Sequence, residues 1–178
     1  MAEPVELVPL ICMKCSTPLP AAPEEVAWVC PTCGTGLELD EQHGLAPLEV
    51  HYSAQIASNA QGKPFWVAQG RLELERSTYA GDKGRDAQRF WSQPQRFFIP
   101  AYTCPLEALL ELGNRLLFQP PALQEGHPAA FTPVTLARGD VQSLADFIVM
   151  TVEAERADKL KEVRFTLNLS EPVLWILP

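Results

Sequence analysis

Alternation of apolar and polar residues predicts that much of the chain after residue 47 folds as β-strands. The clearest run covers residues 48–56, where one face carries Leu48, Val50, Tyr52, Ala54 and Ile56. A period of two is typical of a half-buried antiparallel strand. Shorter runs predict further strands over residues 66–75, 97–99, 134–136, 163–169 and 173–177.

Apolar residues at helical spacing predict two helices. Pro105 suits the first position of a helix, which places Cys104 at the N-cap, and Pro120 ends the helix. Its apolar stripe consists of Leu106, Leu109, Leu110, Gly113 and Leu117. The second helix covers residues 141–157 after the capping residue Asp140. Its stripe consists of Val141, Leu144, Ala145, Ile148 and Val152. The polar stretch 81–86 is expected to be a loop.

The order of these elements predicts an α+β fold with a mostly antiparallel sheet and two helices packed on it. We expect two domains: residues 1–45, ending in a hinge at residues 41–44, and residues 46–178. No run of apolar residues approaches the roughly 18 that a transmembrane helix requires. No internal repeat is apparent from this pattern.

Four of the five cysteines fall in two closely spaced pairs. Fourteen residues separate the pair Cys12 and Cys15 from the pair Cys30 and Cys33. Two residues between cysteines let a tight turn direct both sulfurs into one small volume. Four thiolates at about 2.3 Å complete the tetrahedral shell of Zn²⁺ and leave no position for a substrate. We therefore expect Cys12, Cys15, Cys30 and Cys33 to bind one structural zinc ion.

The residues around these cysteines resemble a zinc ribbon, which carries two cysteine turns on short antiparallel strands. Gly34 follows the second pair, residues 26–30 favour a strand, and residues 36–39 alternate. The resemblance covers residues 8–40 and implies nothing about residues 46–178. The alternative is a disulfide framework. Residues 1–4 lack the basic start of a secretory signal, which favours a reducing, cytoplasmic location and disfavours disulfides.

The distribution of charge argues against nucleic acid as a partner. The chain has a formal net charge of −8, and residues 1–45 carry one cation, Lys14, against seven acidic residues. Phosphate binding requires a cationic surface. Residues 83–96 combine basic and aromatic side chains, which favours stacking on single-stranded nucleic acid, but Asp86 dilutes their charge. The aromatic residues of this stretch have a second interpretation as core.

Catalytic motifs are not apparent in the sequence. Cys104 sits at a predicted helix start, where a thiol can become reactive, but its apolar neighbours favour a buried thiol. The histidines His43, His51 and His127 match no hydrolytic zinc motif and are interpreted as surface residues. The acidic residues Glu153, Glu155 and Asp158 near a helix end are interpreted as a solvated face. No motif indicates a small-molecule ligand.

We therefore expect a non-enzymatic protein-binding or assembly subunit with a structural zinc ribbon. The alternative is an enzyme with an unrecognised active site in residues 46–178, and a weaker alternative is nucleic-acid binding through residues 83–96. Residues 147–150 are apolar around a full helical turn, and residues 173–177 are expected at a sheet edge. These two segments predict a homo-oligomer or a contact with another protein.

Overall fold

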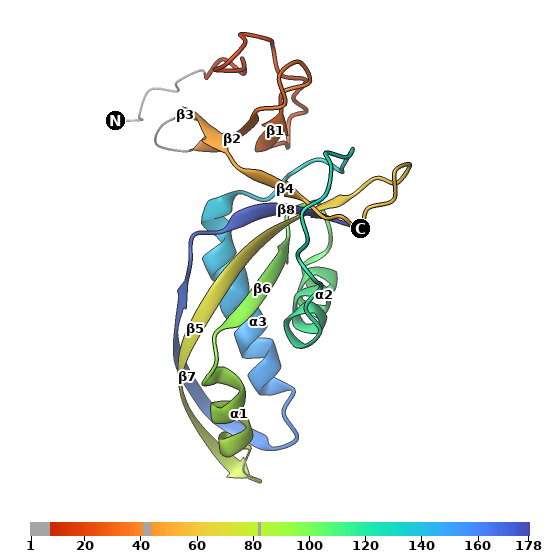
Figure 1. Ribbon diagram of the computed structural model, residues 1–178. Coiled ribbons are helices and arrows are strands. Elements are labelled where there is room, and N and C mark those ends of the chain that lie inside the picture. Colours follow the sequence, from red (N-terminus) through yellow and green to blue (C-terminus); the bar gives the residue numbers. More distant parts are fainter. Residues whose placement is uncertain (1–7, 41–43, 82) are drawn as a thin grey trace, which may run out of the picture.

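Two sheets and three helices make up the computed structural model, which describes residues 8–40, 44–81 and 83–178 (Figure 1). The small sheet contains β1 (Ala27–Val29), β2 (Gly36–Asp40) and β3 (Gly44–Leu48). The large sheet contains β4 (Val50–Tyr52), β5 (Lys63–Ala80), β6 (Gln95–Pro100), β7 (Lys159–Leu169) and β8 (Val173–Leu177). The helices are α1 (Gly84–Trp91), α2 (Leu106–Phe118) and α3 (Val141–Ala154), and the 3-10 turn η1 (Arg138–Asp140) precedes α3. The predicted α+β class is confirmed.

The long strand β5 organises the large sheet. Its first half pairs antiparallel with both β6 and β8, whereas residues 70–80 pair antiparallel with β7. Figure 1 shows this second half and β7 curving away together toward α1. Residues 64–68 of β5 are buried, and beyond residue 70 the strand alternates between exposed and half-buried positions. In the first half, Trp66 and Val67 belong to different core clusters, so both faces of the strand are covered, whereas Leu72 and Leu74 in the second half pack on the main core alone.

The predicted single strand over residues 48–56 is wrong. Residues 44–48 belong to β3, which pairs with β2, and only residues 50–52 enter the large sheet as β4. β4 also runs parallel to β8 rather than antiparallel to a neighbour. Side chains alternate in the same way in both sheets and both directions, so the pattern could not identify the partner strand.

The predicted edge position of residues 173–177 is also wrong. β8 lies between β4 and β5, and Leu174, Ile176 and Leu177 are buried. A strand with neighbours on both sides has no unpaired backbone edge to offer another protein. This segment therefore does not support the predicted contact surface.

Helix α3 covers one face of the sheet (Figure 1). Its buried residues Val141, Ala145, Ile148 and Val149 belong to the same core as Trp66 of β5 and Phe97 of β6. Helix α2 packs beside β6 and approaches α3 at Gly113, where a Cβ atom would lie 2.4 Å from Cδ1 of Ile148. A larger residue at position 113 would therefore force the buried Ile148 side chain to move. The two predicted helices are therefore present and packed on the sheet.

The helix ends differ slightly from the predicted ones. Pro105 is the N-cap of α2 and Leu106 its first residue, so Cys104 lies outside the helix. Asp140 is the N-cap of α3 as predicted, but its side chain makes no capping hydrogen bond. Helix α3 ends at Ala154, three residues before the predicted end.

Helix α1 was not predicted, because residues 81–86 were interpreted as a loop. It is eight residues long and buries only Ala87 and Trp91, which are four residues apart. That spacing is the one sequence signal for a helix here. A stripe of two apolar residues is too short to stand out in a polar segment.

The small sheet is attached to the large one through shared core residues. Ala27 of β1 and Leu48 of β3 belong to the main core. The backbone N–H of Val26 donates to the carbonyl of Val134 at 2.9 Å. Residues 41–43 of the predicted hinge 41–44 lie outside the described residues, and Gly44 is the first residue of β3. The division into residues 1–45 and 46–178 stays a prediction.

Candidate functional site

The four N-terminal cysteines lie together on two turns of the same shape. In the first turn, the N–H of Cys12 donates to the carbonyl of Thr17 at 2.8 Å, and the N–H of Ser16 donates to the carbonyl of Cys12 at 2.9 Å. In the second turn, the N–H of Cys30 donates to the carbonyl of Thr35 at 2.9 Å, and the N–H of Gly34 donates to the carbonyl of Cys30 at 2.9 Å. The two halves of the site thus repeat one backbone motif.

The repeat extends to the side chains, and the spacing of the cysteines alone does not predict it. Both halves read C-x2-C-x-T-x-L, from Cys12 to Leu19 and from Cys30 to Leu37. Both leucines are buried beside the cysteines. The residue after each second cysteine has a positive φ, 59° at Ser16 and 70° at Gly34. Aligning the two cysteine pairs would have revealed this motif.

Hydroxyl groups and burial act oppositely on the thiols. The hydroxyl of Thr17 lies 3.2 Å from the Sγ of Cys15, and that of Thr35 lies 3.2 Å from the Sγ of Cys33. The Thr17 hydroxyl lowers the pKa of Cys15, and the Thr35 hydroxyl lowers the pKa of Cys33 to about 6. Burial raises the pKa of Cys30 to about 11. In each turn, a threonine hydroxyl thus stabilises the thiolate of the second cysteine, which is Cys15 or Cys33.

The sulfur positions fit a tetrahedral metal ion. The four Sγ atoms all lie within 4.8 Å of one another, and the pairs Cys12–Cys33 and Cys15–Cys30 are 3.5 Å apart. Four thiolates bound at about 2.3 Å to one ion would be about 3.8 Å apart. All five cysteines of the chain are free thiols. The cluster can therefore hold a metal ion with a complete shell of protein ligands.

The other predicted candidates do not join this cluster. Cys104 is half-buried, and burial raises the pKa of its thiol, which agrees with an unreactive side chain.

Of the predicted surface histidines, His43 lies outside the described residues. His51 is not an isolated surface residue, because it contacts Glu125 through Nδ1 and Glu49 through Nε2 at 3.3 Å. Its ring also stacks on Trp175 with centroids 4.8 Å apart.

A cavity of about 710 Å³ lies between the loops 53–61 and 125–130. Backbone hydrogen bonds join the loops at both ends, from Ala54 to Gln124 and from Gly62 to Ala130. Small side chains leave the space between them open. The cavity is lined by polar groups from Ser53, Asn59, Gln61, Glu125 and His127.

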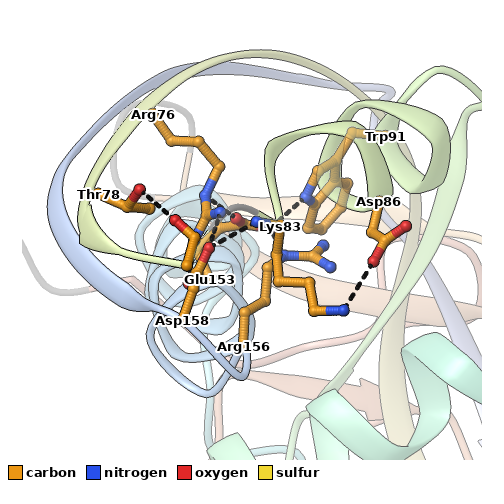
Figure 2. Close-up of polar contacts among 9 residues, drawn as sticks. Arg76, Thr78, Lys83, Asp86, Trp91, Glu153, Arg156 and Asp158 are labelled. Carbon is orange, nitrogen blue, oxygen red and sulfur yellow. Dashed lines mark hydrogen bonds and ion pairs between the residues drawn. The ribbon is translucent and has the colours of Figure 1, made fainter.

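The interpretation of Glu153 and Asp158 as a solvated face is wrong, since both side chains are fully buried. Arg76 of β5 contacts both of them (Figure 2). It donates to both carboxylate oxygens of Asp158 at 2.6 and 2.9 Å, and its Nε lies 3.0 Å from Glu153. Glu153 also accepts hydrogen bonds from the indole of Trp91 at 2.7 Å and from Arg156 at 2.8 Å.

This buried ion-pair cluster joins α1, α3 and β5. Two guanidinium groups balance two carboxylates, and the N–H of Lys83 at the start of α1 donates to Asp158 at 2.8 Å. Hydrogen bonds from Arg76 lower the pKa of Asp158 to about 2. The carboxylates are already engaged by protein donors, so the cluster has a structural role. Glu155 is exposed, as predicted for a solvated side chain.

The aromatic residues near the basic stretch 83–96 are mostly core residues. Trp91, Phe97 and Phe98 are buried, and Phe90 packs against Phe118 with ring centroids 4.9 Å apart. Buried rings cannot stack on bases. Arg85 and Arg89 on α1 remain exposed.

Comparison with known proteins identifies no relative. No family model matches the chain, and no curated protein or solved structure is significantly similar to it. Within the described ranges, no helix has the length and apolar character needed to cross a membrane.

Proposed function

We propose that this chain is a non-enzymatic protein-binding or assembly subunit whose N-terminal ribbon is held together by a structural zinc ion. The main support for the proposal is that four cysteine sulfurs lie close enough together to form a complete ligand shell. A catalytic zinc site keeps one coordination position open, whereas four thiolates fill the shell. The zinc therefore maintains structure and leaves function to the surface that it orders.

Zinc is the metal that best suits this donor set. Thiolate ligands in a tetrahedral arrangement favour Zn²⁺ or an iron–sulfur centre over Mg²⁺ and Ca²⁺, which prefer oxygen ligands. One ion among four cysteines on two tight turns is the arrangement of structural zinc sites. The free thiols and the metal site both suit a reducing compartment such as the cytoplasm.

The ribbon also exposes several apolar side chains. The exposed large apolar residues of the ribbon are Val8, Ile11, Met13 and Leu39, and Met13 is 62% exposed beside a cysteine ligand. A small metal-ordered module holds such side chains in fixed positions, which reduces the entropic cost of binding a partner. Exposed apolar residues on a rigid module support protein docking.

The proposal is tested by metal analysis and by gentle purification from the native cell. We expect one zinc per chain and a stoichiometric partner that is lost in the double variant Ile11→Glu/Met13→Glu. Ala21→Glu adds acidic charge at an exposed position of the same ribbon and should retain the partner. An absence of zinc in freshly reduced protein, or equal binding by both variants, would contradict the proposal.

A second candidate function, an enzyme or small-molecule binder, is favoured by the cavity between loops 53–61 and 125–130. Its volume is in the range of ligand sites, and its lining contains both a carboxylate and an imidazole. Thermal-shift screening against small polar molecules would test it. Hits should disappear in Ala57→Leu/Ala129→Leu, which fills the cavity. Failure of every compound to stabilise the protein would remove this candidate.

A further inference from the structure

Helices α1 and α2 together present a surface with opposite charges on its two sides. Where the two helices meet, Phe118 of α2 is 53% exposed and packs on Phe90 of α1. On the α1 side, Arg85 and Arg89 are exposed. On the α2 side, Glu107 and Glu111 are exposed. We define these six residues as the α1–α2 surface.

None of the four charged residues has an ion-pair partner in the part of the chain that the structure describes. Asp86 of α1 is instead paired with Lys83, at 3.4 Å. As far as the described residues show, the two arginines and the two glutamates can therefore pair with charges of another molecule.

The acidic side borders a groove between α2 and α3. A groove of about 610 Å³ runs between α2 and α3 and is lined by Glu107, Glu111, Arg115, Phe118, Thr151 and Glu155. Three of these residues are acidic and one is basic. Phe147 lies four residues before Thr151 on the same side of α3 and is 48% exposed, which adds an apolar residue near the groove.

We propose that a second copy of this chain binds the α1–α2 surface, with α1 of each protomer against the acidic groove of the other. A two-fold rotation axis near Phe118 places the arginines of each protomer against the glutamates of the other. The dimer therefore contains two identical contacts between basic and acidic residues. The spacing matches, because each charged pair is four residues apart on its helix, about 6 Å along the axis. The Phe118 rings then lie near the symmetry axis and lose their exposure.

The opposed charges favour a second copy over other partners. A nucleic acid would meet three carboxylates beside the two arginines and be repelled by them. A self-complementary surface needs both signs, and an isologous contact uses both in each protomer. This inference rests on the proposed function in one respect, since it names the partner of the α+β part of a protein-binding subunit.

Charge reversal tests the contact in the full zinc-loaded chain. Sedimentation velocity and light scattering over a concentration series should show a dimer for the wild type, weakened by salt. Both Arg85→Glu/Arg89→Glu and Glu107→Lys/Glu111→Lys should raise the dimer Kd about 100-fold or more, because like charges then face each other at both contacts. The control Lys159→Glu/Lys161→Glu makes the same charge change on β7 and should dimerise like the wild type.

Mixing the two charge-reversed variants of the α1–α2 surface gives the decisive result. One contact of the mixed dimer then has both charges exchanged and the other is wild type, so the Kd should return to within about tenfold of the wild-type value. A wild-type chain that is monomeric throughout, or a mixture that stays monomeric, would overturn the inference. Binding of a fluorescent single-stranded oligonucleotide by a monomer, lost on arginine reversal, would replace it with nucleic-acid binding. Zinc content and ribbon-dependent partner capture in the same variants report on the proposed function separately.

Discussion

Arg138 of η1, the turn before α3, forms an ion pair with Glu38 of the ribbon strand β2, with Nη2 and Oε1 2.8 Å apart. The guanidinium also lies 5.3 Å from the centre of the Trp66 ring in β5. One side chain thus contacts the ribbon, the central strand of the large sheet and, through Glu171, the turn before β8. Burial raises the pKa of Glu38, and the positive charge of Arg138 opposes that shift.

Loss of one cysteine should affect the two parts of the chain unequally. We expect Cys12→Ser to abolish zinc binding and unfold the ribbon, because the metal supplies the folding free energy of such a module. The large sheet should remain folded with a lower melting temperature, since Ala27 and Leu48 contribute to its core. Metal analysis and circular dichroism measure both effects. Cooperative unfolding of the whole chain would contradict the predicted division at residue 45.

The two cysteine turns differ at one backbone position, which allows a matched pair of substitutions. Ser16 and Gly34 occupy equivalent positions, and both have a positive φ, which glycine adopts without strain. No atom lies near the position of a Cβ atom at Gly34, so a serine there would be strained by the backbone conformation and not by a clash. We expect Ser16→Gly to stabilise and Gly34→Ser to destabilise the metal-bound ribbon by about 1 kcal/mol each. Competition with a chelator would show opposite shifts in metal affinity. Shifts of the same sign would contradict the equivalence of the turns.

Glu153 should be among the side chains that the fold needs most. Glu153→Gln removes the carboxylate that pairs with Arg156 and with Nε of Arg76, and leaves Asp158 as the acidic partner of Arg76 in this buried site. The excess positive charge should lower the free energy of unfolding by about 3 kcal/mol. Glu155→Gln is the control, because Glu155 is exposed and its loss should change stability by about 0.5 kcal/mol or less. Chemical denaturation measures both. Equal effects would show that the buried cluster does not stabilise the fold.

Acid should weaken the same cluster. The pKa of Asp158 falls from an ordinary value of 3.8 to about 2 in the folded chain, because Arg76 favours the carboxylate. A lowered pKa contributes stability that is complete above pH 3.8 and is lost as the pH falls through about 2. Over that window the wild type should lose stability more steeply than Asp158→Asn. Parallel pH profiles of the two proteins would contradict this assignment.

Cys104 should react slowly with thiol reagents. Burial raises the pKa of its thiol and so lowers the fraction of nucleophilic thiolate at neutral pH. In zinc-loaded protein, iodoacetamide should label it more slowly than a free cysteine, and Cys104→Ser should identify that signal by mass spectrometry. Faster labelling than that of free cysteine would reopen a catalytic interpretation.

Local patterns were sufficient for several elements. The spacing of the cysteines predicted which four side chains would meet, because a C-x2-C turn and its return strand are determined by neighbours in sequence. The apolar stripes of α2 and α3 predicted both helices, since helical periodicity is a local property. The position of β7 followed from alternation, and those of β6 and β8 followed from short continuous apolar runs, which are also local patterns.

Only the tertiary structure decided which strands are neighbours and which charges are buried. β8 lies inside the sheet because β5 pairs with one of its sides and β4 with the other, and no pattern within residues 173–177 encodes these two neighbours. Glu153 is buried because Arg76 and Trp91 approach it from distant positions. A carboxylate reads as a surface residue until its partners are known, since only pairing offsets the cost of removing its charge from water. The sequence by itself thus determined the cysteine cluster and helices α2 and α3, whereas the fold determined the strand order, helix α1 and the buried ion pairs.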